Sequence, residues 1–258
     1  MRLGGFGKIA DYSSIWRAGF DYAELDVPEI ESMPEREFCI FNDKVHKSGF
    51  PVLIGARALP AAEPLFFTDY FRAADFRDYL ENACRRANLL GMDKIILGNG
   101  KARQLPDDTS ISKEHQFIEF MRMFAEIAGN SNLEVILEPL GPEYSNYINT
   151  LPEAVRMIHE VNMPNLFTMA DLRHLHWSKE PLANIEQYAD YVHHIHIDYP
   201  VSYPARPFPR AEDDFDYSEF LAVIKNSGYQ DTLTVEADTP KDWNRAYTAA
   251  AGVLKDVL

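Results

Sequence analysis

Short apolar segments rich in β-branched residues alternate with longer segments of helical periodicity along the whole chain. Strands separated by helices imply parallel pairing, because a parallel connection needs a crossover long enough to hold a helix. Eight such units in 258 residues predict an α/β fold, a closed (β/α)8 TIM barrel that forms a single domain over residues 1–258. An open doubly wound sheet is the alternative, but no GxGxxG motif opens a helix here. The predicted strands are 2–6, 22–27, 51–56, 94–99, 133–139, 166–171, 193–198 and 232–237.

Two of the expected helices carry start signals. In "NTLPEAVRMIHEV", Thr150 can cap the helix and Glu153 can reach back to it, which is the capping-box pattern. Asp216 and Glu219 stand in the same relation before "FLAVIKNSG". Longer helices are expected over 67–91 and 111–129, where apolar residues recur at helical spacing.

The charge of the chain limits its partners. The formal net charge is −15, and a surface this acidic repels phosphate backbones, so we expect no nucleic-acid partner. No apolar run reaches the ~18 residues of a membrane span, and the first residues lack a signal-peptide core. We therefore expect a cytoplasmic protein without a membrane partner. Two cysteines, Cys39 and Cys84, are too few for a disulfide framework and are expected to be reduced and structural.

The segment "VHHIHIDYP" (192–200) carries three of the chain's eight histidines. Side chains on a strand alternate between the two faces of the sheet. Ile195 and Ile197 suit the face that packs on helices, so His194 and His196 should face the barrel axis and His193 the helices. His196 should lie near the top, and His194 deeper, because a strand rises ~3.3 Å per residue. We expect His196 to bind a cation and His194 to be its neighbour in the core.

The same alternation turns an acidic residue inward at the end of three further strands. These residues are Glu138, Asp171 and Glu236. Catalytic groups of such barrels lie at the carboxyl ends of strands, so the three carboxylates and His196 should converge. One carboxylate at a strand end is usually only a solvated charge. Inward-facing residues of this kind at the ends of four consecutive strands, three of them carboxylates, would be costly to bury without a cation. Three carboxylates and one imidazole suit Mn, Mg or Co, and Zn is compatible.

Four stretches, "LEPLGPEYSNYINT", "MADLRHLHW", "HHIHIDYP" and "LTVEAD", resemble the xylose isomerase-like sugar phosphate isomerase/epimerase family, whose members include D-tagatose 3-epimerase-type enzymes. The resemblance covers nearly the whole chain. It implies a TIM barrel with one catalytic divalent metal ion, often Mn, bound by Glu138, Asp171, His196 and Glu236. It also implies that Glu138 and Glu236 act as acid and base.

The resemblance further implies three substrate-binding positions. His174, three residues after Asp171, corresponds to a substrate-binding histidine. In the family an arginine usually follows shortly after the strand histidine. Arg206 is the first candidate and Arg210 the second, and both lie several residues further along the chain than the family pattern. A glutamate usually follows the first ligand; Glu143 lies near that place, about one residue out of register.

Two more residues have alternative roles. Arg103, in "GNGKAR", either faces the site or holds its loop. Glu24 either lines the pocket or is a surface charge.

These residues predict an isomerase or epimerase that removes a proton from a carbon next to a carbonyl of a small sugar or polyol-like substrate. A metal-dependent dehydratase or lyase starts with the same step and is the alternative. An endonuclease IV-like nuclease would need more histidines at strand ends, and the third and fourth strands offer none. The family often forms dimers or tetramers, so the resemblance implies a homodimer or a homotetramer.

Overall fold

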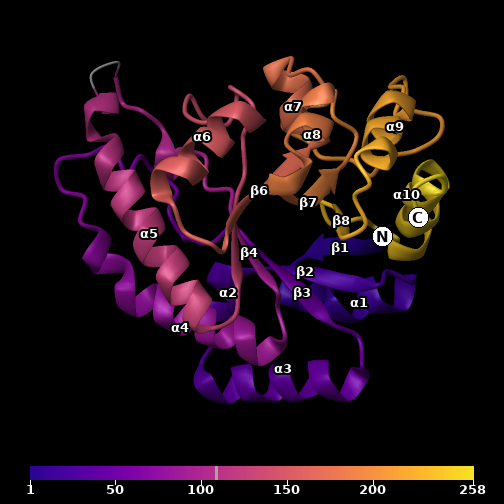
Figure 1. Ribbon diagram of the computed structural model, residues 1–258. Helices are drawn as coiled ribbons and strands as arrows, with labels where there is room; N and C mark the ends of the chain where they lie inside the picture. The colour runs from indigo at the N-terminus through magenta and orange to yellow at the C-terminus, as the bar shows by residue number, and fades with distance from the viewer. Residues whose placement is uncertain (108–109) are drawn as a thin grey trace.

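Eight parallel strands form a closed barrel in the computed structural model, which describes residues 1–107 and 110–258. Each strand pairs with the next along the chain, and β1 pairs with β8 to close the barrel. Figure 1 shows the strands at the centre of the molecule with the helices around them. This confirms the predicted TIM barrel. The strands are β1 (Arg2–Gly7), β2 (Tyr22–Asp26), β3 (Val52–Ala56), β4 (Lys94–Leu97), β5 (Glu134–Leu137), β6 (Leu166–Asp171), β7 (Val192–Ile197) and β8 (Thr232–Val235).

Helices fill every connection between successive strands. The α-helices are α1 (Tyr12–Ala18), α2 (Val27–Glu31), α3 (Glu35–Ser48), α4 (Arg77–Leu90), α5 (Glu114–Asn130), α6 (Leu151–Val161), α7 (Leu172–Ser178), α8 (Ala183–Gln187), α9 (Ser218–Asn226) and α10 (Trp243–Leu254). Single 3₁₀ turns are η1 (Ile9–Asp11), η2 (Ala73–Phe76), η3 (Lys101–Arg103), η4 (Ser110–Lys113) and η5 (Ala189–Tyr191). Within the described ranges, every helix is too short or too polar to cross a lipid bilayer.

The helix starts agree with the sequence in one case and differ in two. At α6 the predicted capping box forms: Thr150 Oγ1 accepts from the Glu153 amide, and Glu153 Oε2 accepts from the Thr150 amide. The box predicted for α9 is wrong, since Tyr217 is the N-cap residue, and Asp216, one residue before it, accepts from the amide of Ser218, the first residue of the helix.

The helix predicted over 67–91 begins only at Ala73, with a 3₁₀ turn that leads into α4. The six residues before it form turns in which Phe67 and Phe71 pack into the aromatic core. Phe71 contacts the ring of Phe120 on α5. Burying these rings against α5 takes the place of the extra helical turns.

The buried apolar residues form two groups. The larger group lies between the strands and the helices and includes Ile195 and Ile197. The smaller group fills the barrel and comprises Tyr22, Leu53, Ile54, Ile96, Ile136 and Met169. Since Ile195 and Ile197 of β7 belong to the outer group, the predicted inward orientation of His194 and His196 is confirmed. The prediction that His193 faces the helices is wrong: the register between β6 and β7 shifts beside this residue, and its ring stacks on Phe167, which packs against the group inside the barrel.

Candidate metal centre and active site

The four predicted ligands lie together at the carboxyl ends of four neighbouring strands. Glu138 follows β5, Asp171 ends β6, His196 is next to last in β7, and Glu236 follows β8. One ligand atom from each lies within 4.8 Å of those of all the others. Three of these side chains are buried, and Glu236 is partly exposed. The cluster therefore has the donor set and the compactness of a site for one divalent cation.

His196 is at the centre of this cluster. Its Nδ1 atom lies 3.2 Å from Glu236 Oε2, 3.7 Å from Asp171 Oδ2 and 3.8 Å from Glu138 Oε1. Over the described part of the chain, this buried nitrogen has no hydrogen-bond partner. A buried polar atom without a partner is costly, and coordination of a cation by its lone pair would remove that cost. The residues present thus fit a divalent metal ion.

The other nitrogen of His196 contacts Glu24, at 3.0 and 3.2 Å from the two carboxylate oxygens. Glu24 is fully buried in β2 and also contacts His194 Nε2 at 3.1 Å. His194 Nδ1 contacts Thr232 Oγ1 at 2.8 Å. Metal-binding histidines commonly donate their second N–H to a carboxylate, which fixes the tautomer and the orientation of the ring. Glu24 holds His196 in this way, so neither of its expected roles, in the pocket or on the surface, is correct.

Burial and charge act on the pKa values of this network in opposite directions. Burial raises the pKa of Glu24, but His196 and His194 outweigh it and hold the pKa well below its usual range. Burial lowers the pKa of His194 to about 4, so this imidazole is neutral at pH 7. Burial also disfavours the charged form of His196, but Glu24 and Glu236 raise its pKa well above the usual value. The carboxylates thus favour a positive charge beside His196, and a bound cation would supply it.

Gly98 and Arg103 fix the position of Glu138. A Cβ atom at Gly98, just after β4, would lie 1.9 Å from Glu138 Oε2, so only glycine leaves room for this carboxylate. Arg103 is fully buried and donates from Nη2 to the backbone carbonyl of Glu138. Of the two roles expected for Arg103, the structure shows that it holds the loop.

His174 lies beside the cluster and is only 3% exposed. Its Nε2 is 3.5 Å from Glu138 Oε1 and 3.6 Å from Asp171 Oδ2. Asp171 Oδ1 accepts from the amides of Arg173 and His174. Asp171 is thus the N-cap residue of α7 and holds the backbone of His174, three residues later, close to its own carboxylate. Glu143 is exposed. A Cβ atom placed on Gly141 would lie 3.7 Å from Glu143 Oε2 and 3.6 Å from His174 Nδ1. The structure places His174 next to the predicted ligands and Glu143 further out.

Arg206 is the arginine of the site. Its Nη2 lies 3.0 Å from Asp171 Oδ2 and 2.5 Å from Glu236 Oε2, and its Nε donates to Asp198 at 3.0 Å. Burial lowers the pKa of Arg206, but Glu236, Asp171 and Asp198 raise it well above its usual range. Arg210 is exposed and lines a neighbouring cavity instead.

Sequence reasoning missed the buried pair that supports Arg206. Arg173, fully buried in α7, donates to Asp198 at 2.7 Å and to the backbone carbonyls of Tyr199 and Ser202. It thereby fixes the loop after β7 that carries Arg206. One signal was present, since Asp198 shares the inward face of β7 with His194 and His196.

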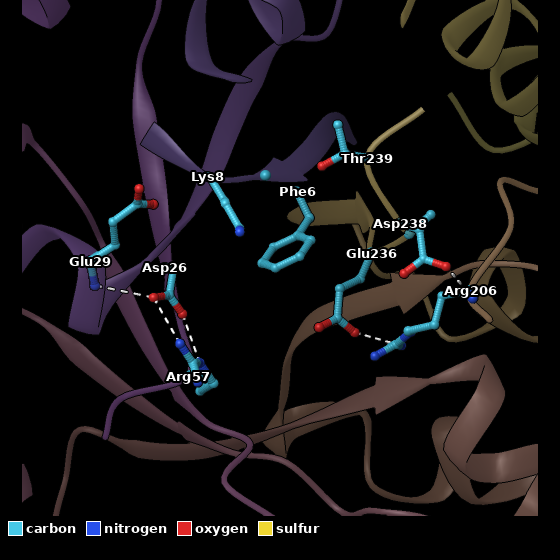
Figure 2. A pocket seen from close by; sticks show the side chains of 11 residues that line it. Phe6, Lys8, Asp26, Glu29, Arg57, Arg206, Glu236, Asp238 and Thr239 are labelled. Carbon is cyan, nitrogen blue, oxygen red and sulfur yellow. Dashed lines mark hydrogen bonds and ion pairs between the residues drawn. The ribbon is translucent and has the colours of Figure 1, made fainter. Parts of the chain in front are cut away.

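A cavity of about 500 Å³ opens beside Glu236. Residues at or just after the ends of β1, β2 and β3 form one side, and residues after β7 and β8 form the other (Figure 2). Its walls are Phe6, Gly7, Lys8, Asp26, Glu29, Arg57, Arg206, Glu236, Ala237, Asp238 and Thr239. The cavity gives a small polar molecule access to the carboxylate of Glu236 and to the guanidinium of Arg206.

Comparisons with known proteins agree with this geometry. A sequence profile of xylose isomerase-like TIM barrels matches residues 15–257. A putative hydroxypyruvate isomerase of Mus musculus is 27% identical over 192 residues, which cover 68% of this chain and 67% of that protein. An L-ribulose 3-epimerase of Methylomonas sp. (strain DH-1) is 24% identical over 230 residues, with 86% of this chain and 75% of that protein covered. A crystal structure of D-allulose 3-epimerase from Methylomonas sp. superposes with a TM-score of 0.80 at 20% identity, over 100% of this chain and 96% of that chain.

Proposed function

The chain belongs to the xylose isomerase-like TIM barrel family, and we propose that it is a divalent-metal-dependent isomerase that moves a proton next to the carbonyl of a ketose or a related hydroxy-ketone. The observation that carries this proposal is the cluster of Glu138, Asp171, His196 and Glu236 beside an open cavity. The names of the relatives support it, because they describe isomerisation of hydroxypyruvate and epimerisation of ketoses at C3. Both reactions begin with loss of a proton α to a carbonyl group.

The two glutamates are the proposed acid and base. They follow β5 and β8, so their carboxylates approach the centre from different sides of the barrel mouth. One carboxylate takes the proton from the carbon next to the carbonyl, and the other returns a proton to the substrate. Return to the opposite face of the same carbon gives an epimer, and return to the neighbouring carbon gives an aldose–ketose isomer. No oxidant or other co-reactant is needed, because a proton leaves and a proton returns.

The other residues bind the substrate and balance charge. A divalent ion at this centre, Mn²⁺ in our proposal, would act as a Lewis acid on the carbonyl and neighbouring hydroxyl oxygens. Arg206 faces Asp171 and Glu236 at the cavity wall, where its guanidinium can donate to a substrate oxygen as negative charge develops. His174 has a buried Nδ1 without a hydrogen bond in the described residues, and we assign it, with Glu143, to substrate hydroxyls.

Replacing each glutamate by glutamine tests this proposal. Glu138→Gln and Glu236→Gln keep the size and one coordinating oxygen but remove the base. Each variant should fold, retain much of its metal and lose turnover by about 10²–10⁴-fold, together with the exchange of substrate C–H for solvent deuterium. Glu134→Gln, four residues earlier at the start of β5 and away from the predicted ligands, is the matched control and should exchange deuterium at the wild-type rate.

NMR spectroscopy in D₂O identifies the reaction and its outcome. Deuterium at one carbon of an epimer or isomer supports the proposal. A product that has lost water would identify the dehydratase or lyase alternative. Near wild-type turnover by either metal-loaded glutamine variant would show that this glutamate is a ligand only and that the two-glutamate mechanism is wrong.

A further inference from the structure

Two basic side chains line the cavity on the side that faces the metal centre. Lys8 directly follows β1 and Arg57 directly follows β3, whereas Glu236 and Arg206 form the opposite side. Figure 2 shows Lys8 and Arg57 on one side of the cavity, Glu236 and Arg206 on the other, and the ring of Phe6 between them. A substrate held at Glu236 therefore extends toward Lys8 and Arg57.

Arg57 forms a two-point ion pair in this wall, with its side chain 53% exposed. Its Nε and Nη2 atoms donate to the two oxygens of Asp26 at 2.7 and 2.9 Å, and Asp26 also caps α2 by accepting from the Glu29 amide. The backbone of Arg57 has φ = 53°, which is strained for a residue with a side chain. Such strain is found preferentially where a side chain must be presented in one direction. Nη1 of Arg57 makes no hydrogen bond in the described residues, so one donor of the fixed guanidinium is free for a ligand.

The ammonium of Lys8 has no partner of its own. Across residues 1–107 and 110–258, no ion pair or side-chain hydrogen bond involves Lys8 Nζ; Lys8 is bound through its backbone, whose amide donates to Asp11 Oδ2 and whose carbonyl accepts from the Asp11 amide. Glu29 also lines the cavity, but its Oε2 accepts from the Ile9 amide. In Figure 2 the Glu29 carboxylate turns away from Glu236, whereas the Lys8 side chain extends beside Phe6. The free donors on this side of the cavity are therefore the Lys8 ammonium and Arg57 Nη1.

Several carboxylate oxygens of the cavity already accept hydrogen bonds. Both oxygens of Asp26 bind Arg57, and Asp238 Oδ2 on the opposite side accepts from the Arg206 amide. Charged donors without a partner bind carboxylate and phosphate oxygens more strongly than neutral hydroxyls. The wall also carries carboxylates, but Asp26 is paired with Arg57 and Glu236 with Arg206, which leaves the Lys8 ammonium as a cation without a paired carboxylate in the described residues.

We propose that the substrate carries an anionic group at the end away from its reacting carbonyl, and that Lys8 and Arg57 bind this group. The inference deepens the proposed function and rests on it: the same centre acts on a keto acid or a keto-sugar phosphate in preference to a neutral ketose.

Three probes with one carbon skeleton separate these cases: D-fructose, D-fructuronate and D-fructose 6-phosphate. Deuterium uptake from D₂O is measured with each at saturating metal, and binding is measured separately by isothermal titration calorimetry. The wild type should take up deuterium from the anionic probes with a kcat/KM at least about 10-fold above that for fructose. A preference for fructuronate identifies a carboxylate site, and a preference for the phosphate identifies a phosphate site.

Lys8→Met should raise KM and Kd for the preferred anion by about 10–100-fold, with kcat nearly unchanged and the values for fructose unaltered. Lys8→Arg should restore most of the affinity. Lys255→Met removes the same charge from the exposed end of α10 and should behave as wild type. Equal use of all three probes, or an equal effect of Lys8→Met on fructose and on the anions, would overturn the anionic site and leave the isomerase intact. An enzyme that binds the anion through Lys8 but exchanges no deuterium would instead refute the proposed function.

Discussion

Glu24→Gln is the most direct test of how the candidate metal centre is built. The variant keeps the shape of a fully buried side chain but replaces one acceptor oxygen by an NH₂ donor. In the wild type, Oε1 lies 3.0 Å from His196 Nε2, and Oε2 lies 3.2 Å from the same nitrogen and 3.1 Å from His194 Nε2. Both oxygens therefore contact His196, and either orientation of the new amide places its NH₂ against this ring nitrogen.

The expected cost follows from the tautomer that a metal ligand needs. If His196 binds a cation through Nδ1, its Nε2 carries the proton and must donate it. In Glu24→Gln this N–H faces one neutral amide oxygen and one NH₂ group in place of two carboxylate oxygens, and the alternative tautomer would protonate Nδ1 and prevent coordination. A hydrogen bond to a charged group contributes about 1.5–3 kcal/mol, and the variant loses this charge-assisted bond. We therefore expect metal affinity to fall about 10–100-fold, the range typical of changes in the carboxylate behind a metal-binding histidine.

The assay is competition for Mn²⁺ against a chelating indicator, with the fold checked by circular dichroism and thermal unfolding. Glu134→Gln is the matched control, because Glu134 also pairs with a histidine of β7, His193, at 2.9 Å. Glu134 and His193 lie at the starts of β5 and β7, at the opposite end of the barrel from the predicted ligands, so this control should bind metal with wild-type affinity. If Glu24→Gln folds and its Kd for Mn²⁺ stays within about twofold of the wild type, His196 does not bind through Nδ1 and the reasoning fails.

Three further predictions concern the rest of the molecule. His174→Ala should raise KM or lower turnover while metal content stays near one equivalent per chain, and loss of the metal would instead make His174 a ligand. Removing metal with EDTA should lower Tm by roughly 5–10 °C relative to protein with metal at 100 times its Kd, as measured by calorimetry, whereas an unchanged Tm would contradict a site in the folded state. Burial raises the pKa of the Cys84 thiol to about 12, so a thiol reagent at pH 8 should label only Cys39 in the native protein and both cysteines after unfolding.

The sequence was sufficient for the barrel and for the positions of the four predicted ligands because both depend on short-range regularities. Alternation of strand and helix segments predicts parallel order, and the two-residue period of a strand predicts which side chains face inward. Ile195 and Ile197 of β7 predicted that His196 faces inward, and these isoleucines do pack among the outer apolar residues. Whether the four side chains bind a metal ion is not contained in that register and stays a prediction.

The supporting contacts could not be predicted because they join residues that are far apart in sequence. Glu24 and His196 are separated by 172 residues, and their pairing depends on the side-chain layers inside a closed barrel. Arg206 reaches the centre from an irregular loop that Arg173 holds through Asp198, and no periodicity governs such a loop. The turns at residues 67–72 were predicted as helix because packing of Phe67 and Phe71 into the aromatic core overrides local propensity there.

The three histidines of β7 occupy three different environments because face and depth vary independently along one strand. His193 lies near the start of β7, beside a register shift between β6 and β7, where it stacks on Phe167 with ring centroids 3.5 Å apart and pairs with Glu134. His194 points inward one layer below the centre and stays neutral, since burial lowers its pKa to about 4. His196 points inward at the top, between Glu24 and the carboxylates of the mouth. His194 helps to hold Glu24, which also contacts His196. An apolar residue at position 194 would therefore remove one hydrogen-bond partner from Glu24 Oε2, an oxygen of a fully buried carboxylate. Such an exchange would cost about 1–3 kcal/mol of folding stability, and it would weaken the position of Glu24, the carboxylate that orients His196.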